Sequence, residues 1–213
     1  MHLISRIEKR SSGRYQILLE GEDSFPLYYK ELRQYGIEEG GVLTEQSYQE
    51  IMRELLPVRA KKKALHLLER MDRTEQQLYR KLADGGYPDQ VAKEAVDYVK
   101  SYHYIDDVRY ARSYIESRKA AKSLRQIERE LYQKGITRED FQCAAAQLEA
   151  PDEERQILSW IEKKRFCVAQ ADRKETDRFL RFLLYRGYGT AVIQKVLRKC
   201  AEFADENVEL HKN

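Results

Sequence analysis

The sequence lacks long apolar runs, paired cysteines and a recognisable export signal. No stretch of the chain approaches the ~20 apolar residues that cross a bilayer, and its start has no basic-then-apolar signal region. The three cysteines, Cys143, Cys167 and Cys200, lie far apart and form no C-x-x-C pair. We therefore expect a cytoplasmic protein without membrane contact, whose reduced thiols occupy apolar helical positions.

Patterns typical of catalytic and metal sites are also missing. The sequence contains no phosphate-binding G-x-x-x-x-G-K-[ST] loop, and its Gly85-Gly86 pair closes a helical pattern instead of following a strand. The four histidines have no ligand spacing with one another or with a cysteine. No serine or cysteine has an evident partner base. We expect neither a cofactor, nor a metal site, nor enzymatic activity.

Hydrophobic content is low and the charges are unevenly distributed. Hydrophobic residues make up 42% of the chain, which argues against one deep core, while 10% aromatic residues and a net charge of only +3 argue against disorder. Residues 1–56 hold 7 basic and 10 acidic residues, whereas residues 155–199 hold 12 basic and 4 acidic ones. The small net charge therefore conceals a locally basic region.

Residues 1–56 are expected to form a small module of strands and helices. The strand-like segments are Ile4–Glu8, Arg14–Glu20 and Phe25–Tyr29, and helical patterns follow over Lys30–Tyr35 and Glu45–Leu56. A turn is expected at Ser11-Ser12-Gly13, and Pro26 favours an edge strand because proline cannot donate to a ladder. Thr44 is a candidate helix cap. Pro57 is expected to end the second helix, because the residue before a proline is disfavoured in helical geometry.

Beyond Arg59 the apolar pattern is helical, and it repeats three times. The repeated segments are Arg73–Val99, Lys122–Leu148 and Lys174–Cys200, which align without gaps at offsets of 49 and 52 residues. The alignment superimposes three glycines, Gly86, Gly135 and Gly187. Each fits the position just after a helix, where a left-handed backbone favours a residue without a β-carbon. Each unit is therefore predicted to contain a helix, a turn and a second helix.

A further helix is expected to precede each pair. These helices span Ala64–Met71, Asp107–Arg118 and Glu154–Lys164. Capping boxes are predicted at Thr74 with Gln77 and at Ser123 with Gln126, whereas the third unit lacks a box at the aligned position. The fold class is thus mainly α, with three tandem three-helix repeats in an elongated array behind a small β-containing module. The expected domains are 1–56, 57–105, 106–150 and 151–213, the last with a C-terminal tail.

Basic residues recur at aligned positions on the middle helix of each unit. Two columns lie seven residues apart, or about two helical turns, and are predicted to face away from the core. The candidate binding residues are Arg73, Arg80, Lys122, Arg125, Arg129, Lys174, Arg178 and Arg181, with Lys163, Lys164 and Arg165 at the end of a neighbouring helix. An ordinary solvated face would also explain one such cluster. Recurrence in three units favours a strip that binds a polyanion or an acidic protein surface.

Two segments of the second unit carry a specific family resemblance. YIDDVRYARSYIESR (104–118) and IERELYQKGI (127–136) resemble the central repeat of the bacterial RecX regulatory proteins, and shorter matches to the other repeats extend the likeness over about residues 60–203. The matching residues, which we interpret as mostly structural, are Asp107, Tyr110, Ala111, Tyr114, Arg118, Leu131, Lys134, Gly135, Gly86 and Gly187. Ala120-Ala121 departs from the glycine expected in the loop before the middle helix.

The resemblance implies a non-enzymatic modulator of the RecA recombinase. Such proteins bind the RecA nucleoprotein filament along its helical groove and mainly inhibit RecA ATPase, strand exchange and filament growth in DNA repair, recombination and the SOS response. The expected partners are therefore the RecA filament and single- or double-stranded DNA, with the protein acting as a monomer. Two alternatives stay open, namely a free-standing DNA-binding protein built on helix-turn-helix-like units and a scaffold for an acidic partner.

Overall fold

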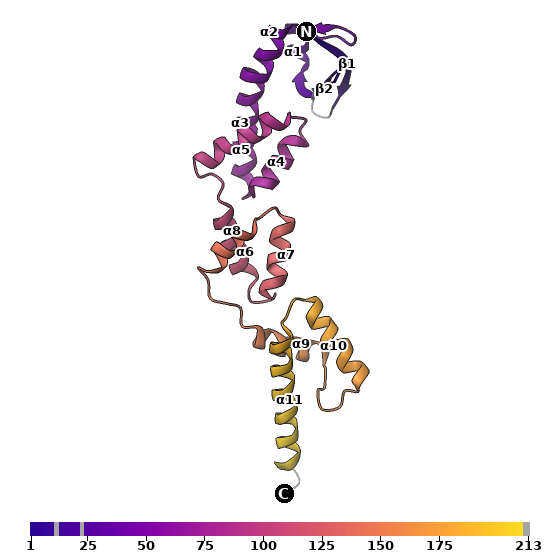
Figure 1. The fold of residues 1–213 in the computed structure, drawn as a ribbon, viewed down its shortest axis with the longest axis vertical. Coiled ribbons are helices and arrows are strands. Elements are labelled where there is room, and N and C mark those ends of the chain that lie inside the picture. The colour runs from indigo at the N-terminus through magenta and orange to yellow at the C-terminus, as the bar shows by residue number, and fades with distance from the viewer. Residues whose placement is uncertain (11–12, 22–23, 211–213) are drawn as a thin grey trace. The chain divides into compact units, whose positions relative to one another are not determined.

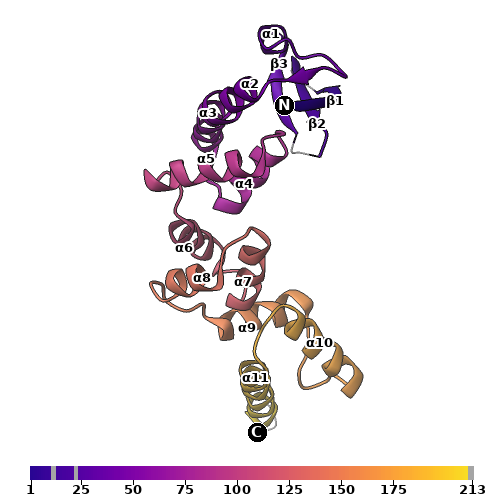
Figure 2. The ribbon, with the colours of Figure 1, turned by 45° about the horizontal axis from the view of Figure 1, so that its top comes forward.

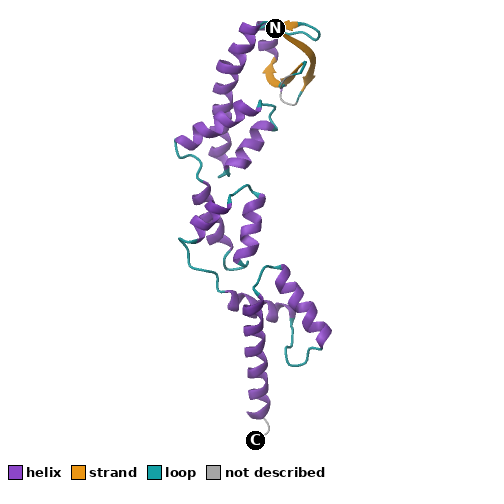
Figure 3. Ribbon diagram, viewed as in Figure 1, coloured by secondary structure: helices purple, strands orange, loops and turns teal. Residues whose placement is uncertain are grey.

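The structure is a computed structural model that describes residues 1–10, 13–21 and 24–210 (Figure 1). It divides into two compact units, Met1–Asp107 and Val108–Asn213. Helices dominate both units, and the described strands belong to the first (Figure 3). None of the described helices is long and apolar enough to cross a membrane. The turn expected at Ser11-Ser12-Gly13 falls mostly outside the described residues.

A four-stranded antiparallel sheet begins the first unit. Its strands are β1 (His2–Lys9), β2 (Arg14–Leu19), β3 (Phe25–Tyr28) and β4 (Val42–Leu43), in the order β3-β2-β1-β4. The three predicted strands are confirmed, and β3 lies at an edge as Pro26 indicated. β4 was not predicted, because two residues are too short to show an alternating pattern.

Five α-helices lie wholly among the described residues of the first unit. They are α1 (Tyr29–Gln34), α2 (Glu45–Glu50), α3 (Leu56–Arg70), α4 (Glu75–Ala83) and α5 (Asp89–Ser101). Thr44 caps α2 as expected, because its hydroxyl accepts a hydrogen bond from the backbone N–H of Ser47.

The predicted helix stop at Pro57 is wrong. A π-helical turn over Ile51–Leu55 joins α2 directly to α3, and the backbone N–H of Leu56 donates to the carbonyl of Ile51, five residues back. In a regular helix the proline ring would clash with the carbonyl four residues earlier. The wider π turn just before Pro57 accommodates the ring, so one helical rod crosses the boundary expected at residue 56.

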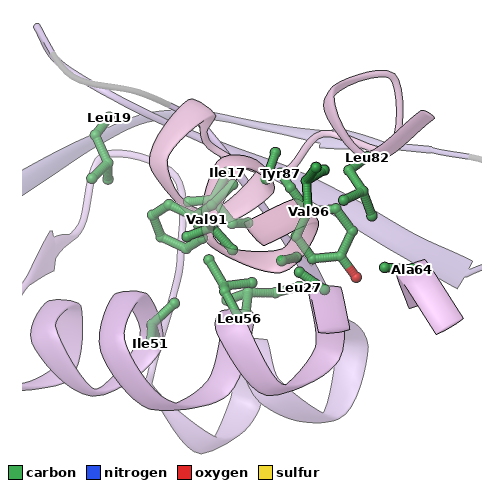
Figure 4. Packing of buried hydrophobic residues seen from close by; sticks show 14 of the residues in the cluster. Ile17, Leu19, Leu27, Ile51, Leu56, Ala64, Leu82, Tyr87, Val91 and Val96 are labelled. Atoms are coloured by element: carbon green, nitrogen blue, oxygen red, sulfur yellow. The ribbon is translucent and has the colours of Figure 1, made fainter. Parts of the chain in front are cut away.

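The sheet and the first helical repeat share one hydrophobic core. Ile17 of β2 and Leu27 of β3 lie in the same buried cluster as Leu56 of α3 and Val91 of α5 (Figure 4). A three- or four-stranded sheet of this size is marginal alone, so it gains stability by packing on these helices. The first 56 residues and the first repeat therefore do not have separate cores.

A buried glutamine joins the sheet to the turn between α4 and α5. Gln16 is only 4% exposed, and its side-chain amide donates to the carbonyl of Gly86 at 3.0 Å and to the hydroxyl of Ser24 at 2.8 Å. A buried amide without partners would be costly, so these bonds define how the sheet and this turn fit together.

The second unit contains two repeats, each with its own core. Its helices are α6 (Asp107–Arg118, which begins at the junction), α7 (Leu124–Gln133), α8 (Arg138–Ala145), α9 (Glu153–Lys164), α10 (Arg173–Tyr185) and α11 (Thr190–Leu210). Ile127 and Leu131 of α7 belong to one buried cluster, and Phe179 and Leu183 of α10 belong to the other. The predicted three-helix repeats are confirmed, and the modest hydrophobic content is divided between small cores.

The predicted capping boxes are complete in the first repeat only. Thr74 and Gln77 form the expected capping box. Ser123 caps α7 through its hydroxyl, but the glutamine three residues later turns to a carboxylate instead of completing the box. The third repeat lacks a box at the aligned position, as expected, and has one three residues earlier, formed by Asp172 and Glu175. Because this cap lies earlier in the aligned repeat, α10 gains about one turn at its start.

The aligned glycines occupy equivalent backbone positions. Gly86, Gly135 and Gly187 have φ angles of +87°, +92° and +91°. All three follow the middle helix of their repeat, as the alignment predicted.

The expectation that the cysteines occupy apolar helical positions holds for one of the three. Cys200 packs against the core of the third repeat, and burial raises the pKa of its thiol. Cys143 lies on the exposed side of α8, and Cys167 is exposed in the loop after α9. The helical pattern places α8 correctly but does not predict that its solvent side carries the thiol.

Candidate functional site

The first predicted basic column does not lie on equivalent helix positions. Arg73 and Lys122 precede the cap residues Thr74 and Ser123, whereas Lys174 lies inside α10. Residues before a cap have non-helical backbone, so a seven-residue spacing does not place them on the same face as the next column. Helical spacing therefore does not establish a common face for the two columns in the first and second repeats.

Lys122 takes part in a charge network inside the second repeat. Its ammonium lies 2.6 Å and 2.8 Å from the two carboxylate oxygens of Glu130, which also accepts a 2.8 Å hydrogen bond from the hydroxyl of Tyr114. Burial opposes ionisation of Glu130, but the hydrogen bonds from Lys122 and Tyr114 outweigh burial and lower its pKa. Lys122 thus holds α7 to the preceding loop and is already paired with an acid.

Several family-motif residues are buried and stabilise the repeats through internal contacts. Asp107 is 7% exposed, and its carboxylate accepts a 3.0 Å hydrogen bond from the backbone N–H of Glu75 at the start of α4. A carboxylate at this position compensates the unpaired donors of the helix N-terminus. Ala111 and Leu131 are fully buried in the core of the second repeat.

The motif tyrosines and cations of the second repeat contact one another. The rings of Tyr110 and Tyr114 are stacked with centroids 6.3 Å apart. The charged groups of Arg118 and Lys134 each lie 5.4 Å from the centre of the Tyr114 ring. These cation–π contacts place both cations over a packed side chain of the repeat.

Three arginines of the second unit form an exposed basic face, which we define as Arg125 and Arg129 of α7 with Arg181 of α10. The guanidinium of Arg129 donates to the carbonyl of Tyr185 at 2.9 Å, so α7 meets the end of α10 at this point (Figure 2). Arg181 lies one turn before Tyr185, whose ring is 81% exposed. These three arginines form no ion pair with a described carboxylate, although the charge of Arg125 opposes the rise that burial causes in the pKa of Glu153.

Three buried contacts between the second and third repeats fix this face, two of them through hydrogen bonds. The hydroxyl of Ser123 donates to the carbonyl of Arg186 at 2.6 Å. The amide of Gln156 in α9 donates to the carbonyls of Lys119 and Lys122 in the loop before α7. The third contact is steric, because a β-carbon on Gly187 would come within 2.8 Å of the Ser123 hydroxyl.

The other predicted basic residues have different surroundings. Arg80 on α4 and Lys174 on α10 are exposed, whereas Arg73 is half-buried and its Nε has no described hydrogen-bond partner. Lys163 lies over the ring of Trp160 at 5.2 Å. The remaining three, Lys164, Arg165 and Arg178, line a hollow in the third repeat.

Sequence reasoning missed one cation–aromatic stack in the third repeat. The guanidinium of Arg186 lies 3.9 Å from the centre of the Trp160 ring and 4.7 Å from that of Phe182. Arg186 lies just before the aligned glycine Gly187, and this position at the end of the middle helix indicated that its side chain could pack within the repeat. Phe182 lies four residues earlier on α10, which Arg186 ends, but Trp160 comes from α9, so the complete stack was not visible in the sequence.

The described residues contain no group of three or more histidine, cysteine, aspartate or glutamate side chains that could hold a metal ion. The exposed guanidinium groups of the basic face offer electrostatic recognition of an anionic surface.

Models of the three RecX three-helix domains match the chain in tandem. The first domain matches residues 60–98, the second 106–144 and the third 152–197. The chain belongs to the RecX family. Its relatives carry the name regulatory protein RecX.

Relatives and solved structures agree with this assignment over nearly the whole chain. Regulatory protein RecX of Caldanaerobacter subterraneus subsp. tengcongensis is 29% identical over 92% of this chain and 98% of its own length. That of Clostridioides difficile is 26% identical over 98% of this chain and 100% of its own length.

A crystal structure of regulatory protein RecX superimposes with a TM-score of 0.60 at 26% identity, covering 92% of this chain and 98% of that one. RecX from Lactobacillus salivarius, at 19% identity and a TM-score of 0.59, shares the fold over 68% of this chain and 96% of its own. The strand-bearing first 56 residues thus fall within the shared length of the RecX relatives.

Proposed function

We propose that this RecX-family chain binds the RecA nucleoprotein filament and restrains RecA ATP hydrolysis, strand exchange and filament growth. RecX regulatory proteins act on RecA, and the domain matches extend through all three repeats. The basic face of Arg125, Arg129 and Arg181 is the single observation that carries the proposal. Exposed guanidinium groups that form no ion pair within the chain attract an acidic protein surface and the phosphates of the bound strand.

The geometry suits a fixed contact more than a flexible one. Arg129 is held by the carbonyl of Tyr185, and the buried bond between Ser123 and Arg186 keeps α7 against the end of α10. Cations presented at fixed spacing lose less side-chain entropy on binding than cations on mobile loops. A filament with regularly spaced acidic groups would therefore be recognised by position as well as by charge.

The test is RecA ATPase on single-stranded DNA, measured with this protein below the RecA concentration. The wild-type chain should inhibit. Replacing Arg125 and Arg181 by glutamine should raise the concentration for half-inhibition about tenfold, because two charged contacts of about 0.5–1 kcal/mol each are lost. Arg33→Gln with Arg53→Gln is the matched control, since both arginines are exposed in the first unit. Absence of inhibition and of filament association by the wild-type chain would refute the proposal.

A second candidate function is direct DNA binding through the same basic face. The exposed ring of Tyr185, whose backbone carbonyl contacts Arg129 and which lies one turn after Arg181, favours it, because aromatic and cationic side chains together stack bases and contact phosphates. In this case the chain binds naked DNA without RecA, and the Arg129→Ala, Arg181→Ala double variant should lower the slope of log affinity against log salt by about 2. An unchanged slope would assign the face to protein contact alone.

A further inference from the structure

The third repeat contains a hollow of about 500 Å³ between the loop after α9 and one side of α10. The residues that line it include Lys164, Arg165, Phe166, Arg178, Phe179 and Phe182. Its volume lies within the range of small-molecule sites, which is roughly 300–1,000 Å³. The hollow lies entirely within the third repeat, so its shape depends on local packing only.

One wall of the hollow is aromatic. The rings of Phe166 and Phe179 are stacked with centroids 4.2 Å apart and planes 16° from parallel, and Phe182 follows at 6.0 Å from Phe179. Arg165 ends α9 in a left-handed conformation, and the backbone N–H of Phe166 then bonds to the carbonyl of Ile161. This turn folds the chain back and places Phe166 against α10.

The rim of the hollow is cationic. Lys164, Arg165 and Arg178 have no carboxylate within ion-pair distance among the described residues, and the Lys164 ammonium lies 5.2 Å from the centre of the Phe182 ring. Glu175 is the acid among the lining residues. Its carboxylate accepts a hydrogen bond from the backbone N–H of Asp172 as part of the cap of α10. Three cations against one acid that is already used make the hollow electropositive.

We propose that this hollow binds a nucleoside phosphate. The half-buried Phe166 ring, backed by Phe179, offers a planar apolar surface for the base, since Lys164 and Arg186 lie over Phe182. Arg165 and Arg178 offer guanidinium groups for the phosphate. An acidic peptide would satisfy the cations but would leave the Phe166 ring without a base to stack on. Free nucleotides and single nucleotides of an unpaired strand share this chemistry. The proposal goes beyond regulation of RecA, because binding is expected in the absence of RecA.

The experiment measures binding of two probes to the full chain. One probe is a fluorescent adenosine monophosphate analogue, and the other is a dye-labelled oligothymidylate, each followed by fluorescence anisotropy. Arg178→Gln should raise the dissociation constant about tenfold, because a charge-assisted bond to phosphate is lost. Phe166→Leu keeps the apolar volume but removes the ring and should raise it about fivefold. Arg198→Gln is the matched control, since Arg198 is exposed on α11 outside the hollow.

The outcomes separate the sources of the ligand and test the proposal. If both probes, or either one, lose affinity in Arg178→Gln and Phe166→Leu but not in Arg198→Gln, the site is supported, and the responding probe identifies its source. No binding of either probe, or equal losses in Arg178→Gln and Arg198→Gln, would overturn it. A polyglutamate peptide that binds with dependence on Arg178 but not on Phe166, while neither nucleotide probe binds, would assign the hollow to an acidic protein instead. The circular dichroism spectrum of each variant is compared with that of the wild type, and a matching spectrum shows that the variant folds.

Discussion

Replacing Gly187 by alanine is expected to weaken the packing of the third repeat on the second. Gly187 has a φ of +91°, which costs a residue with a β-carbon about 1–2 kcal/mol. The new β-carbon would also lie 2.8 Å from the hydroxyl oxygen of Ser123 and 3.0 Å from the β-carbon of Arg125. Relieving such contacts costs about 1–3 kcal/mol. We therefore expect a loss of about 2–4 kcal/mol in the free energy of unfolding.

Urea unfolding followed by tryptophan fluorescence measures this loss directly. Trp160 is the single tryptophan of the chain, and its indole nitrogen lies 3.3 Å from the hydroxyl of Tyr188, the residue after Gly187. The unfolding midpoint should fall by about 1–2 M urea. Gly189→Ala is the matched control, because a β-carbon there meets no atom within 4 Å and its backbone is not left-handed. This control should stay within about 0.5 kcal/mol of the wild type.

Two results would refute the reasoning. One is a Gly187→Ala variant as stable as the wild type, and the other is an equal loss in Gly189→Ala. The double variant Ser123→Ala, Gly187→Ala adds a sharper criterion. Since the Ser123 hydroxyl is the closest obstacle to the new β-carbon, the double variant should lose less stability than the sum of the two single variants.

The remaining predictions concern the first unit and the charge network of the second. Gln16→Leu leaves the Gly86 carbonyl unpaired and should cost about 1–3 kcal/mol in urea unfolding monitored by circular dichroism, whereas Gln133→Leu on an exposed position should be nearly neutral. Burial, followed by the hydrogen bond to Glu50, raises the pKa of Tyr35 from 10.0 to about 12. The unfolded chain therefore loses the Tyr35 proton at lower pH than the folded chain does, so the free energy of unfolding should fall as the pH rises from 10 to 12. In the Tyr35→Phe variant the free energy of unfolding should fall less steeply over this range. Folding lowers the pKa of Glu130 from 4.5, so its ionised carboxylate stabilises the fold above pH 4.5, and this stabilisation is lost as the pH falls below that value. Glu130→Gln should remove this share of the acid sensitivity, and an unchanged acid transition would contradict the assignment.

Local patterns determined the repeats because each repeat has its own turn chemistry. The aligned glycines all have left-handed backbone, and the caps at Thr74 and Ser123 lie where the pattern indicated. Such signals act over a few residues, so a sequence displays them directly. The same locality explains the error at Pro57, where a π turn lying upstream lets the helix continue.

The basic face depends on contacts that residue spacing does not encode. Residue patterns alone were enough to predict three tandem helical repeats, their middle helices and a surplus of basic residues in the last part of the chain. The pairing of Lys122 with Glu130 and the contact of Arg129 with the carbonyl of Tyr185 are visible only in the fold. The fold also brings Phe166 and Arg178 to the same hollow. An arginine on a helix has the same sequence pattern whether its partner is a carboxylate, a carbonyl or solvent, and the partner comes from another part of the chain.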